Sequence, residues 1–489
     1  MAAGAYAPPV GRPWLIAILA ILVAFRLIFD FAAPPFGDEA YYWLWGQRPA
    51  LSYFDHPGGN AWLLGLFSTV GWHPMVLRLG GLIATAATLP IFAYWARRLA
   101  GPTWLDYLLT AAAIWLASPL IFIFGGLAFS DYLLIFLGLL AAHVFFLFFL
   151  GAEDGRPRYP LLYAAAVLLG LAGLAKYVAI FIAIAVALTI VTRPRLQFLL
   201  RSPHLYLAAL LTLAVQTPSI AWSVAHDFPT FRFQAARMSG SLGFKSLSNA
   251  LMFLLGGAAI LSPPLVPALF GYLRRPTGEA GADLWRRMGT ILFAVSTGLF
   301  LIQSLRTWVF VYWNILAVIL FFPLAPLYLR SRLLFVSHAI VGVAVALAVT
   351  ANYALLPLGP LFGGADKDTA GNYGWPAIAA EVTAEAERTN AGFLAGANYQ
   401  MAAELGFALH RADIACVGPA CHQFDLWPDP RREGGSAILI GPDRAPDPQA
   451  VARFTTLESI GTIPVVRFGF TIATYRLYLG TGFHETPAR

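Results

Sequence analysis

The sequence carries very little charge for its length. Only 12% of its 489 residues are Asp, Glu, Lys or Arg, whereas 59% are hydrophobic, and the mean hydropathy is +0.68. A chain of this composition cannot form an ordinary water-soluble core over its whole length. We therefore expect a polytopic α-helical membrane protein.

Cysteine is also nearly missing. The chain has two, Cys416 and Cys421, and a turn at Gly418 and Pro419 can close a small loop between them. A disulfide and two free thiols both fit this spacing, and an oxidising compartment would preserve the bond. A zinc site is disfavoured, because His422 alone stands nearby and zinc takes four ligands.

Motifs for bound cofactors are scarce too. The chain has no recognisable nucleotide-binding loop, and no three carboxylate or imidazole groups lie at a spacing diagnostic of a metal. We expect neither a metal nor another cofactor, although these groups are able to bind a divalent ion.

Long apolar runs are the main positive feature. A helix needs about 20 apolar residues to cross the hydrocarbon layer. About eleven segments fit, namely 14–31, 77–99, 103–121, 127–150, 160–174, 177–191, 205–223, 250–273, 288–305, 308–328 and 333–354. The fifth and sixth are short and can form a tight helical hairpin around Lys176. The first is not followed by a cleavage pattern of small residues, so we expect it to be retained.

Arginine collects in alternate connections, as it does in cytoplasmic loops. With a cytoplasmic N-terminus, the inner loops contain Arg97, Arg98, Arg156, Arg158, Arg193, Arg195, Arg201, Arg274, Arg275, Arg286, Arg287, Arg330 and Arg332. An odd number of spans then places the loop at 33–76 and everything after Pro357 outside the cytoplasm. The net charge of +7 is largely due to these arginines and needs no nucleic-acid partner.

The composition changes near Gly359, where charged residues return and long apolar runs stop. We expect a transmembrane domain at 1–357 and a soluble domain at 358–489. Residues 392–397 and 437–441 are typical of buried strands, 399–409 of a helix, and 463–479 of one or two strands. Together they indicate a small α/β layer.

The first outer loop contains two acidic motifs. Asp38 and Glu39 follow the first span, and Asp55 with His56 comes seventeen residues after Asp38. Acidic residues often cap the end of a span, which is the simpler interpretation of Glu39. For Asp38 the aromatic residues at 41–45 favour a functional role, because a low-dielectric edge raises the pKa of a carboxyl. Such a group can accept a proton, hold a polar substrate or bind a metal.

Several further polar residues lie at the predicted outer ends of spans. Lys176 lies in a long apolar stretch and needs an anionic partner, either Asp131 or a lipid phosphate, unless it is a turn lysine that reaches headgroups. Asp131 itself either caps a helix or contacts a substrate. Arg237 and Arg306, like His226 beside them on the outer side, can bind phosphate or merely contact headgroups.

In their order along the chain, these motifs resemble the lipid-linked-sugar glycosyltransferases of the GT-C superfamily, specifically the protein O-mannosyltransferase-like group that includes bacterial lipid A aminoarabinose transferases. Asp38 and Glu39 resemble the acidic pair of that group. Residues 53–57 are similar to its Tyr-Phe-acid-basic-Pro-Pro segment, with Gly58 in place of the second proline.

The resemblance extends over nearly the whole chain. Residues 218–237 are similar to a Pro…Trp-Asn…His…Phe…Phe…Arg segment of that group, with Ser223 in place of the asparagine. Residues 398–407 and 422–427 resemble the terminal soluble domain of the bacterial members. These matches imply a GT-C fold with a C-terminal extracytoplasmic α/β domain.

The resemblance also implies an activity. It is an inverting transfer of a sugar from a polyprenyl phosphate to a lipid A-like or other lipid, a glycan or a protein, on the periplasmic face of the bacterial cytoplasmic membrane. No nucleotide sugar is used, which agrees with the missing nucleotide-binding loop. The implied partners are the lipid-linked donor, the acceptor and membrane lipids.

Within that chemistry Asp38 is expected to deprotonate the acceptor or, if the acceptor is an ionised phosphate, to orient it. Lys176, Arg237 and Arg306 would offset the charge on the departing phosphate, with His56 and His226 as further donors. The candidates for acceptor or sugar contacts are Glu39, Tyr53, Asp55, His56 and Asp131.

A transporter or flippase of a lipid-linked glycan is the alternative. Inverted repeats would support it, but no corresponding pair of Gly/Pro-broken spans is recognisable in two halves, and a large soluble tail is less expected. A noncatalytic scaffold would leave the acids and cations of the outer loops without a purpose.

Overall fold

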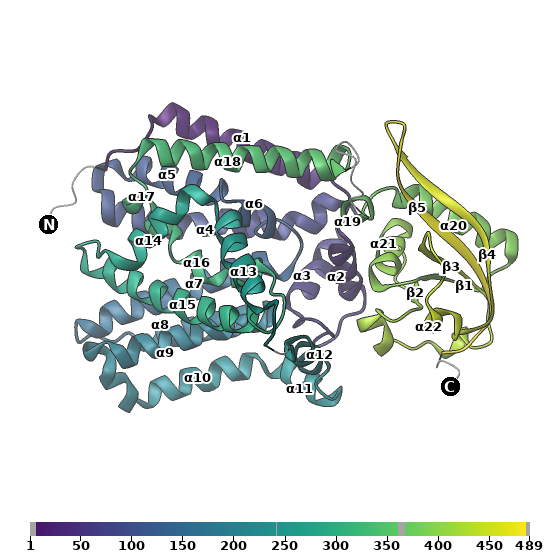
Figure 1. The fold of residues 1–489 in the computed structure, drawn as a ribbon. Helices are drawn as coiled ribbons and strands as arrows, with labels where there is room; N and C mark the ends of the chain where they lie inside the picture. The colour runs from purple at the N-terminus through teal and green to yellow at the C-terminus, as the bar shows by residue number, and fades with distance from the viewer. Residues whose placement is uncertain (1–5, 241, 360–366, 486–489) are drawn as a thin grey trace. The chain divides into compact units, whose positions relative to one another are not determined.

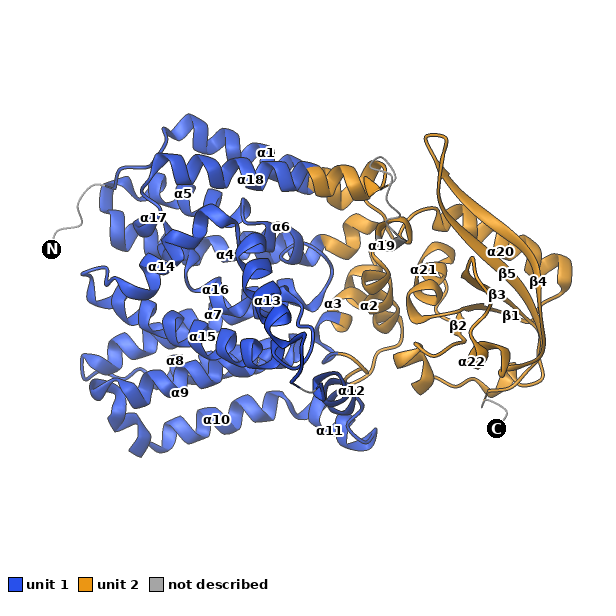
Figure 2. Ribbon diagram, viewed as in Figure 1, with its two compact units in different colours: residues 1–26, 56–60, 79–347 blue, residues 27–55, 61–78, 348–489 orange. Residues whose placement is uncertain are grey.

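The computed structural model describes residues 6–240, 242–359 and 367–485 (Figure 1). Its chain forms two compact units (Figure 2). Unit 1 contains the chain up to residue 26 together with 56–60 and 79–347, and unit 2 contains 27–55, 61–78 and the chain from 348 onward. The first outer loop is therefore divided, with 56–60 in unit 1 and its other residues in unit 2.

Helices make up the chain as far as residue 355. They are α1 (Arg12–Ala32), α2 (Gly37–Gln47), α3 (Gly59–Ser68), α4 (Pro74–Ala100), α5 (Trp104–Leu116), α6 (Pro119–Phe124), α7 (Ser130–Glu153), α8 (Tyr159–Ala175), α9 (Ile180–Thr192), α10 (Pro203–Val215), α11 (Thr217–Ala225), α12 (Pro229–Met238), α13 (Ser246–Leu261), α14 (Val266–Arg274), α15 (Ala280–Ser304), α16 (Leu316–Ile319), α17 (Ala325–Tyr328) and α18 (Arg332–Thr350). A short π-helix, Ala351–Leu355, continues α18.

Among the described residues, five helical segments are long and apolar enough to cross a membrane, namely Arg12–Ala32, Pro74–Leu116, Ser130–Glu153, Ala280–Ser304 and Arg332–Leu355. Three bent pairs raise the number to eight if each pair is one span: Tyr177–Thr192 with Pro194–Arg201, Pro203–Val215 with Thr217–Ala225, and Ser246–Leu261 with Pro263–Arg274. Two shorter apolar helical segments are Tyr159–Ala175 and Leu316–Tyr328. Each expected span falls on helical structure, while the count of eleven stays a prediction.

The breaks in these helices have local causes. Proline has no backbone N–H and cannot continue a helix without losing a hydrogen bond. Pro218 stands where α10 and α11 meet at 53°, and Pro263 follows Ser262, a residue with φ of 107°, where α13 and α14 meet at 91°. The break between the short helices α8 and α9 falls at Lys176, which has an extended backbone.

Unit 2 contains a five-stranded sheet in its described part. Its strands are β1 (Phe393–Gly396), β2 (Ala415–Cys416), β3 (Ala437–Pro442), β4 (Phe454–Arg467) and β5 (Phe470–Phe483), in the order β2-β1-β3-β5-β4. β1 pairs in parallel with β2 and β3, whereas β5 is antiparallel to β3 and β4. The other helices of this region are α19 (Lys367–Ala370), α20 (Trp375–Thr389), α21 (Tyr399–Leu409) and α22 (Pro448–Val451).

The expected small α/β layer is present. The helix expected at 399–409 is α21, and Asn398 caps it by accepting a hydrogen bond of 2.9 Å from the backbone N–H of Met401. The segment expected as one or two strands at 463–479 is two strands, because residues 468 and 469 form a tight turn inside it. The domain expected from 358 onward also includes 360–366 and 486–489, which lie outside the described residues.

Candidate active site

The two acids of the first outer loop lie in the first turn of α2. Negative side chains are favoured there, because the first N–H groups of a helix have no partner inside it and the helix dipole is positive at this end. Glu39 uses this position as a cap, since its Oε2 accepts a hydrogen bond of 3.0 Å from the backbone N–H of Phe36. The capping interpretation of Glu39 therefore describes part of its role.

Arg78, which the sequence analysis did not single out, holds the same carboxylate. Its guanidinium donates to both oxygens of Glu39, at 3.0 and 2.6 Å, and both side chains are completely buried. Its other N–H groups donate to the carbonyls of Phe29, Ala33 and Pro34 at 2.9 to 3.2 Å. All five donors of the arginine are thus satisfied, so the buried pair ties α2 to the preceding chain.

A third carboxyl faces this pair. Glu404 on α21 is buried, and burial raises its pKa well above the usual value, with the charge of Glu39 adding to the effect and that of Arg78 opposing it. The shift favours the neutral form of Glu404 beside the ion pair of Glu39 and Arg78.

Asp38 has a different environment from its neighbour. It is only partly buried, and its Oδ1 accepts hydrogen bonds from the Tyr399 hydroxyl at 2.8 Å and from the Gln400 side-chain amide at 3.3 Å. Burial raises the pKa of Asp38, while the two hydrogen bonds oppose this and the charge of Glu39 adds to it. Asp38 is thus an accessible carboxylate held in place by two residues of α21.

The second half of the motif, residues 53–55, is also held by the C-terminal region. Gln423 accepts a hydrogen bond of 2.7 Å from the Phe54 backbone through its side chain and donates its own backbone N–H to the Tyr41 hydroxyl at 2.8 Å. Burial raises the pKa of Tyr41 well above its usual value, and the nearby carboxylate of Asp55 raises it further. Asp55 therefore lies beside a neutral phenol.

Tyr53 is fully buried. Its ring stacks on Trp45 with centroids 4.7 Å apart, and its hydroxyl donates to the Trp45 carbonyl and accepts from the Ala50 backbone N–H. These contacts shape the loop that carries Asp55. The predicted contact between Tyr53 and a sugar or acceptor stays a prediction.

A second polar group lies in unit 1. The ammonium of Lys176 donates to both oxygens of Asp131 at 2.8 and 3.0 Å, and the two side chains are almost completely buried. The sequence left two partners open for Lys176, Asp131 or a lipid phosphate. In the structure its partner is Asp131. The ammonium also lies 5.2 Å from the ring centroid of Tyr312.

The loop residues 56–60 pack at the same end of unit 1. Asn60 donates to the Ala128 carbonyl at 2.9 Å, and Gly59 lies so close to the end of α8 that a Cβ there would be 2.7 Å from the Leu174 carbonyl oxygen. Burial, and then the charge of Lys176, lowers the pKa of His56 to about 3. His56 is therefore a neutral imidazole at physiological pH.

The predicted phosphate-binding residues have different surroundings. Arg237 is exposed and lies over the rings of Phe233, Phe310 and Trp313, at 5.0 to 5.8 Å from their centroids. The side chain of Arg306 is exposed as well.

His226, by contrast, is tied to its own helix. It stacks on Trp222 with centroids 4.3 Å apart, and its Nδ1 is 2.9 Å from the carbonyl of the same residue.

The aromatic run that follows Arg306 connects two of the cations. Arg237 lies over Phe310 and Trp313, and Lys176 lies over Tyr312. These rings contact one another, with centroid distances of 5.5 Å between Phe310 and Trp313 and 5.7 Å between Phe310 and Tyr312. The signal in the sequence was the run of aromatics directly before α16.

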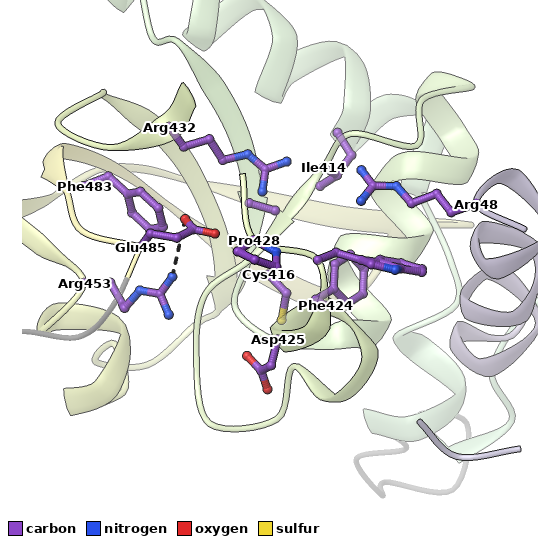
Figure 3. Close-up of a pocket in the computed structure, with 12 residues that line it drawn as sticks. Arg48, Ile414, Cys416, Phe424, Asp425, Pro428, Arg432, Arg453, Phe483 and Glu485 are labelled. Atoms are coloured by element: carbon purple, nitrogen blue, oxygen red, sulfur yellow. Dashed lines mark ion pairs between the residues drawn. The ribbon is translucent and has the colours of Figure 1, made fainter. Parts of the chain in front are cut away.

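The C-terminal region has a polar pocket of its own (Figure 3). It encloses about 490 Å³, part of it open to solvent. Its lining residues are Arg48, Ile414, Ala415, Cys416, Phe424, Asp425, Trp427, Pro428, Arg432, Arg453, Phe483 and Glu485. Of the predicted site residues, Cys416 contributes to this lining.

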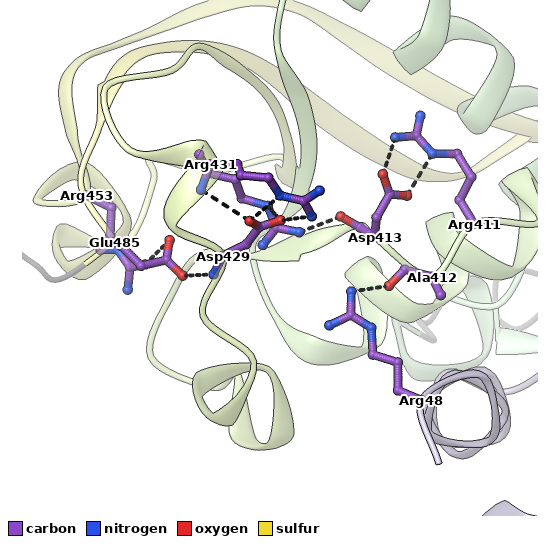
Figure 4. A network of polar contacts seen from close by, with 9 residues as sticks. Arg48, Arg411, Ala412, Asp413, Asp429, Arg431, Arg453 and Glu485 are labelled. Carbon is purple, nitrogen blue, oxygen red and sulfur yellow. Dashed lines mark hydrogen bonds and ion pairs between the residues drawn. The ribbon is translucent and has the colours of Figure 1, made fainter. Parts of the chain in front are cut away.

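Arginines dominate the polar contacts around this pocket (Figure 4). Arg48 donates to the Ala412 carbonyl at 2.7 Å and lies over the ring of Trp427. Ion pairs join Arg411 to Asp413, Arg431 to Asp429 and Arg453 to Glu485. Burial, followed by the charge of Arg432, lowers the pKa of Arg48.

Cys416 and Cys421 form a disulfide in the structure. It closes the loop before the short helix that contains Gln423. Among the residues that the structure describes, no group of three His, Cys, Asp or Glu side chains could hold a metal ion.

These features define a class: a polytopic helical membrane protein whose first loop carries an accessible carboxylate against an α/β domain. Residues 55–222 match the family model described as dolichyl-phosphate-mannose-protein mannosyltransferase. The crystal structure of ArnT from Cupriavidus metallidurans bound to undecaprenyl phosphate has a similar fold, with a TM-score of 0.64, 15% sequence identity, and coverage of 96% of this chain and 98% of that chain.

A curated relative adds to these matches. Lipid A galacturonosyltransferase RgtD from Rhizobium johnstonii is 25% identical over 225 residues, which is 45% of this chain and 45% of that protein, so the match spans less than half of the relative's length. The family model and the curated relative thus both have sugar-transferase names, and the likeness to the solved structure is one of fold.

Proposed function

We propose that this protein is an inverting glycosyltransferase that uses a polyprenyl-phosphate-linked sugar and modifies a lipid A-like acceptor. Support comes from a relative named lipid A galacturonosyltransferase and from the similar fold of ArnT, whose crystal structure has undecaprenyl phosphate bound. We place it in the bacterial cytoplasmic membrane with eleven spans, a transmembrane domain at 1–357 and a periplasmic domain from 358.

The main structural support for this proposal is the environment of Asp38. Its neighbour Glu39 is buried and neutralised by Arg78, whereas Asp38 is partly exposed and oriented by Tyr399 and Gln400. Of the two adjacent acids, Glu39 therefore stabilises the fold, whereas Asp38 is available to contact a substrate. An oriented carboxylate with a raised pKa is suited to accept a proton from a hydroxyl.

The reaction requires one bond to form as another breaks. An oxygen of the acceptor attacks C1 of the sugar on the face opposite the phosphate, the bond from C1 to the phosphate oxygen breaks, and the configuration at C1 inverts. If the acceptor is a hydroxyl, its proton passes to Asp38. If the acceptor is an ionised phosphate, no proton moves, and Asp38 holds the sugar or acceptor in the attacking geometry.

The cations have unequal roles in this scheme. Arg237 is exposed and held over three rings, so its donors are available to oxygens of the departing phosphate. Lys176 is already neutralised by Asp131, so it adds little net charge to the site. His56, being neutral, can donate a hydrogen bond to a phosphate or sugar oxygen but contributes no positive charge.

The test is a transfer assay with purified protein in lipid, a labelled polyprenyl-phosphate sugar and lipid A. We expect Asp38→Asn and Asp38→Ala to lower kcat by about 10²- to 10⁴-fold if Asp38 is the base. Asp443→Asn is the matched control, because that carboxylate is exposed and paired with Arg476 in the same domain. A thermal melt of each variant checks that folding is unchanged.

The pH profile distinguishes a base from an orienting group. A base must be ionised, so the rate should fall as the pH drops through the pKa of Asp38, which burial raises above the usual value. Transfer that is unaffected by both Asp38 substitutions would reject its role. Lipid movement across vesicles without transfer from any donor would favour the flippase.

A further inference from the structure

The longest hairpin of unit 2 extends beyond its sheet. β4 and β5 have 14 residues each, but β3 pairs with β5 only from Tyr475 to Gly480. The remaining part of β5, from Phe470 onward, pairs with β4 alone and is about 17 Å long at roughly 3.3 Å per residue. Figure 1 shows this part of the hairpin projecting past β1 and β3.

The end of this hairpin is apolar and exposed. Val466, Phe468 and Phe470 have 54%, 74% and 49% of their surface exposed. Soluble proteins usually protect a projecting edge with charged residues or proline. Apolar side chains that are exposed together in this way indicate a surface that is covered by a partner.

Contacts inside unit 2 fix where this end lies. Arg467 donates to the carbonyl of Leu355 at 3.0 and 3.3 Å, and it lies over the ring of Tyr373. Leu355 is the last residue of the candidate span Arg332–Leu355 and is itself 57% exposed. The hairpin end is therefore held at the point where a membrane span finishes.

We propose that Val466, Phe468 and Phe470, with Leu355, form a patch that inserts into the interfacial layer of the lipid bilayer. The patch adjoins the end of a candidate span, because Arg467 contacts Leu355, and aromatic rings with a neighbouring arginine are typical of the membrane interface. Insertion of the patch would bring Arg467 to the level of the headgroup phosphates. The hairpin is thus a second membrane anchor of the C-terminal region, besides the chain connection through α18.

The anchor has a structural purpose. The sheet that contains the hairpin also packs against α21, whose Tyr399 and Gln400 orient Asp38. A domain attached to the membrane at two points cannot rock about a single connection, so the height of these residues above the bilayer becomes fixed. This inference depends on α18 as a membrane span and not on the transfer reaction.

The test uses a nitroxide label on an introduced cysteine, which is selective because Cys416 and Cys421 are bonded to each other. Phe468→Cys places the label at the turn, and Glu458→Cys places it at an exposed position on β4, ten residues before the turn. In vesicles we expect the label at 468 to be several-fold more accessible to oxygen, and less accessible to an aqueous nickel reagent, than the label at 458.

Two outcomes would overturn the proposal. If both labels are equally accessible to the aqueous reagent, the hairpin end lies in water. If the label at 468 is shielded from oxygen and from the nickel reagent alike, a protein covers the patch instead of lipid. Both positions are exposed, so neither variant disturbs the core, and sugar transfer plays no part in the readout.

Discussion

Asp38 and Glu39 are adjacent and have the same charge, but they have different surroundings in this protein. Glu39 lies fully inside the fold, with a guanidinium on both carboxylate oxygens, whereas Asp38 lies half inside it with a phenol and an amide as donors. The difference arises because successive residues of a helix point about 100° apart. One of them consequently faces the core and the other faces the candidate site.

We expect Glu39→Gln to destabilise the protein strongly. It would leave the guanidinium of Arg78 buried without a counter-ion, which costs about 3–5 kcal/mol. The prediction is checked by thermal unfolding of the purified protein in detergent. A double variant, Glu39→Gln with Arg78→Met, should recover much of the loss because no buried charge remains.

The matched comparison is Asp38→Asn, which should unfold close to the natural protein while losing transfer activity. Unfolding of Glu39→Gln at the same temperature as the natural protein would contradict the structural role of the buried pair.

At the scale of elements, the candidate site depends on how closely α2 and α21 approach. Gly37 lies against Gln400, so that a Cβ at Gly37 would be 2.8 Å from the Cβ of Gln400. The side-chain amide of Asn372 also lies 3.3 Å from the Gly37 backbone N–H and accepts a hydrogen bond from it. This close approach lets the donors of α21 reach Asp38.

Gly37→Ala tests this approach. The two helices would have to move apart, which we expect to destabilise the protein by about 1–3 kcal/mol and to disturb the 2.8 Å bond between Tyr399 and Asp38. Transfer kinetics and thermal unfolding measure the two effects. Gly461→Ala is the control, since a Cβ there meets nothing within 4 Å, and equal activity of the two variants would contradict the argument.

At the scale of the molecule, the arrangement of the spans decides which groups share a compartment. The distribution of arginine predicts that the inner loops face the cytoplasm and that the C-terminal domain faces the periplasm. In the proposed function, an acceptor lipid reaches Asp38 only from the side of the membrane on which this domain lies.

Labelling with a membrane-impermeant thiol reagent checks the orientation. In intact bacterial cells we expect Glu458→Cys to react at once and Arg156→Cys to react only after permeabilisation. Both residues are exposed, and the two natural cysteines are bonded. Reaction of Arg156→Cys in intact cells would reverse the proposed topology.

Much of the fold was predictable because its signals are local. Apolar runs marked the helices of the first 357 residues, and the helix expected at 399–409 is α21, whose cap, Asn398, acts on a backbone N–H only three residues away. The hairpin of β4 and β5 was only partly recognised, since its turn consists of Phe468 and Gly469, and phenylalanine with a positive φ is unusual.

The candidate site was less predictable, because its contacts join distant parts of the chain. Arg78 is 39 residues from Glu39, and Tyr399 is 361 residues from Asp38. The residues next to Asp38 and Glu39 in the sequence do not indicate these partners. The sequence by itself determined that the chain is a membrane protein with acids in its first loop. It could do so because the hydropathy of a segment depends only on the residues of that segment. Only the tertiary structure decided which acid is buried and which is available, because burial depends on the segments that pack around a side chain.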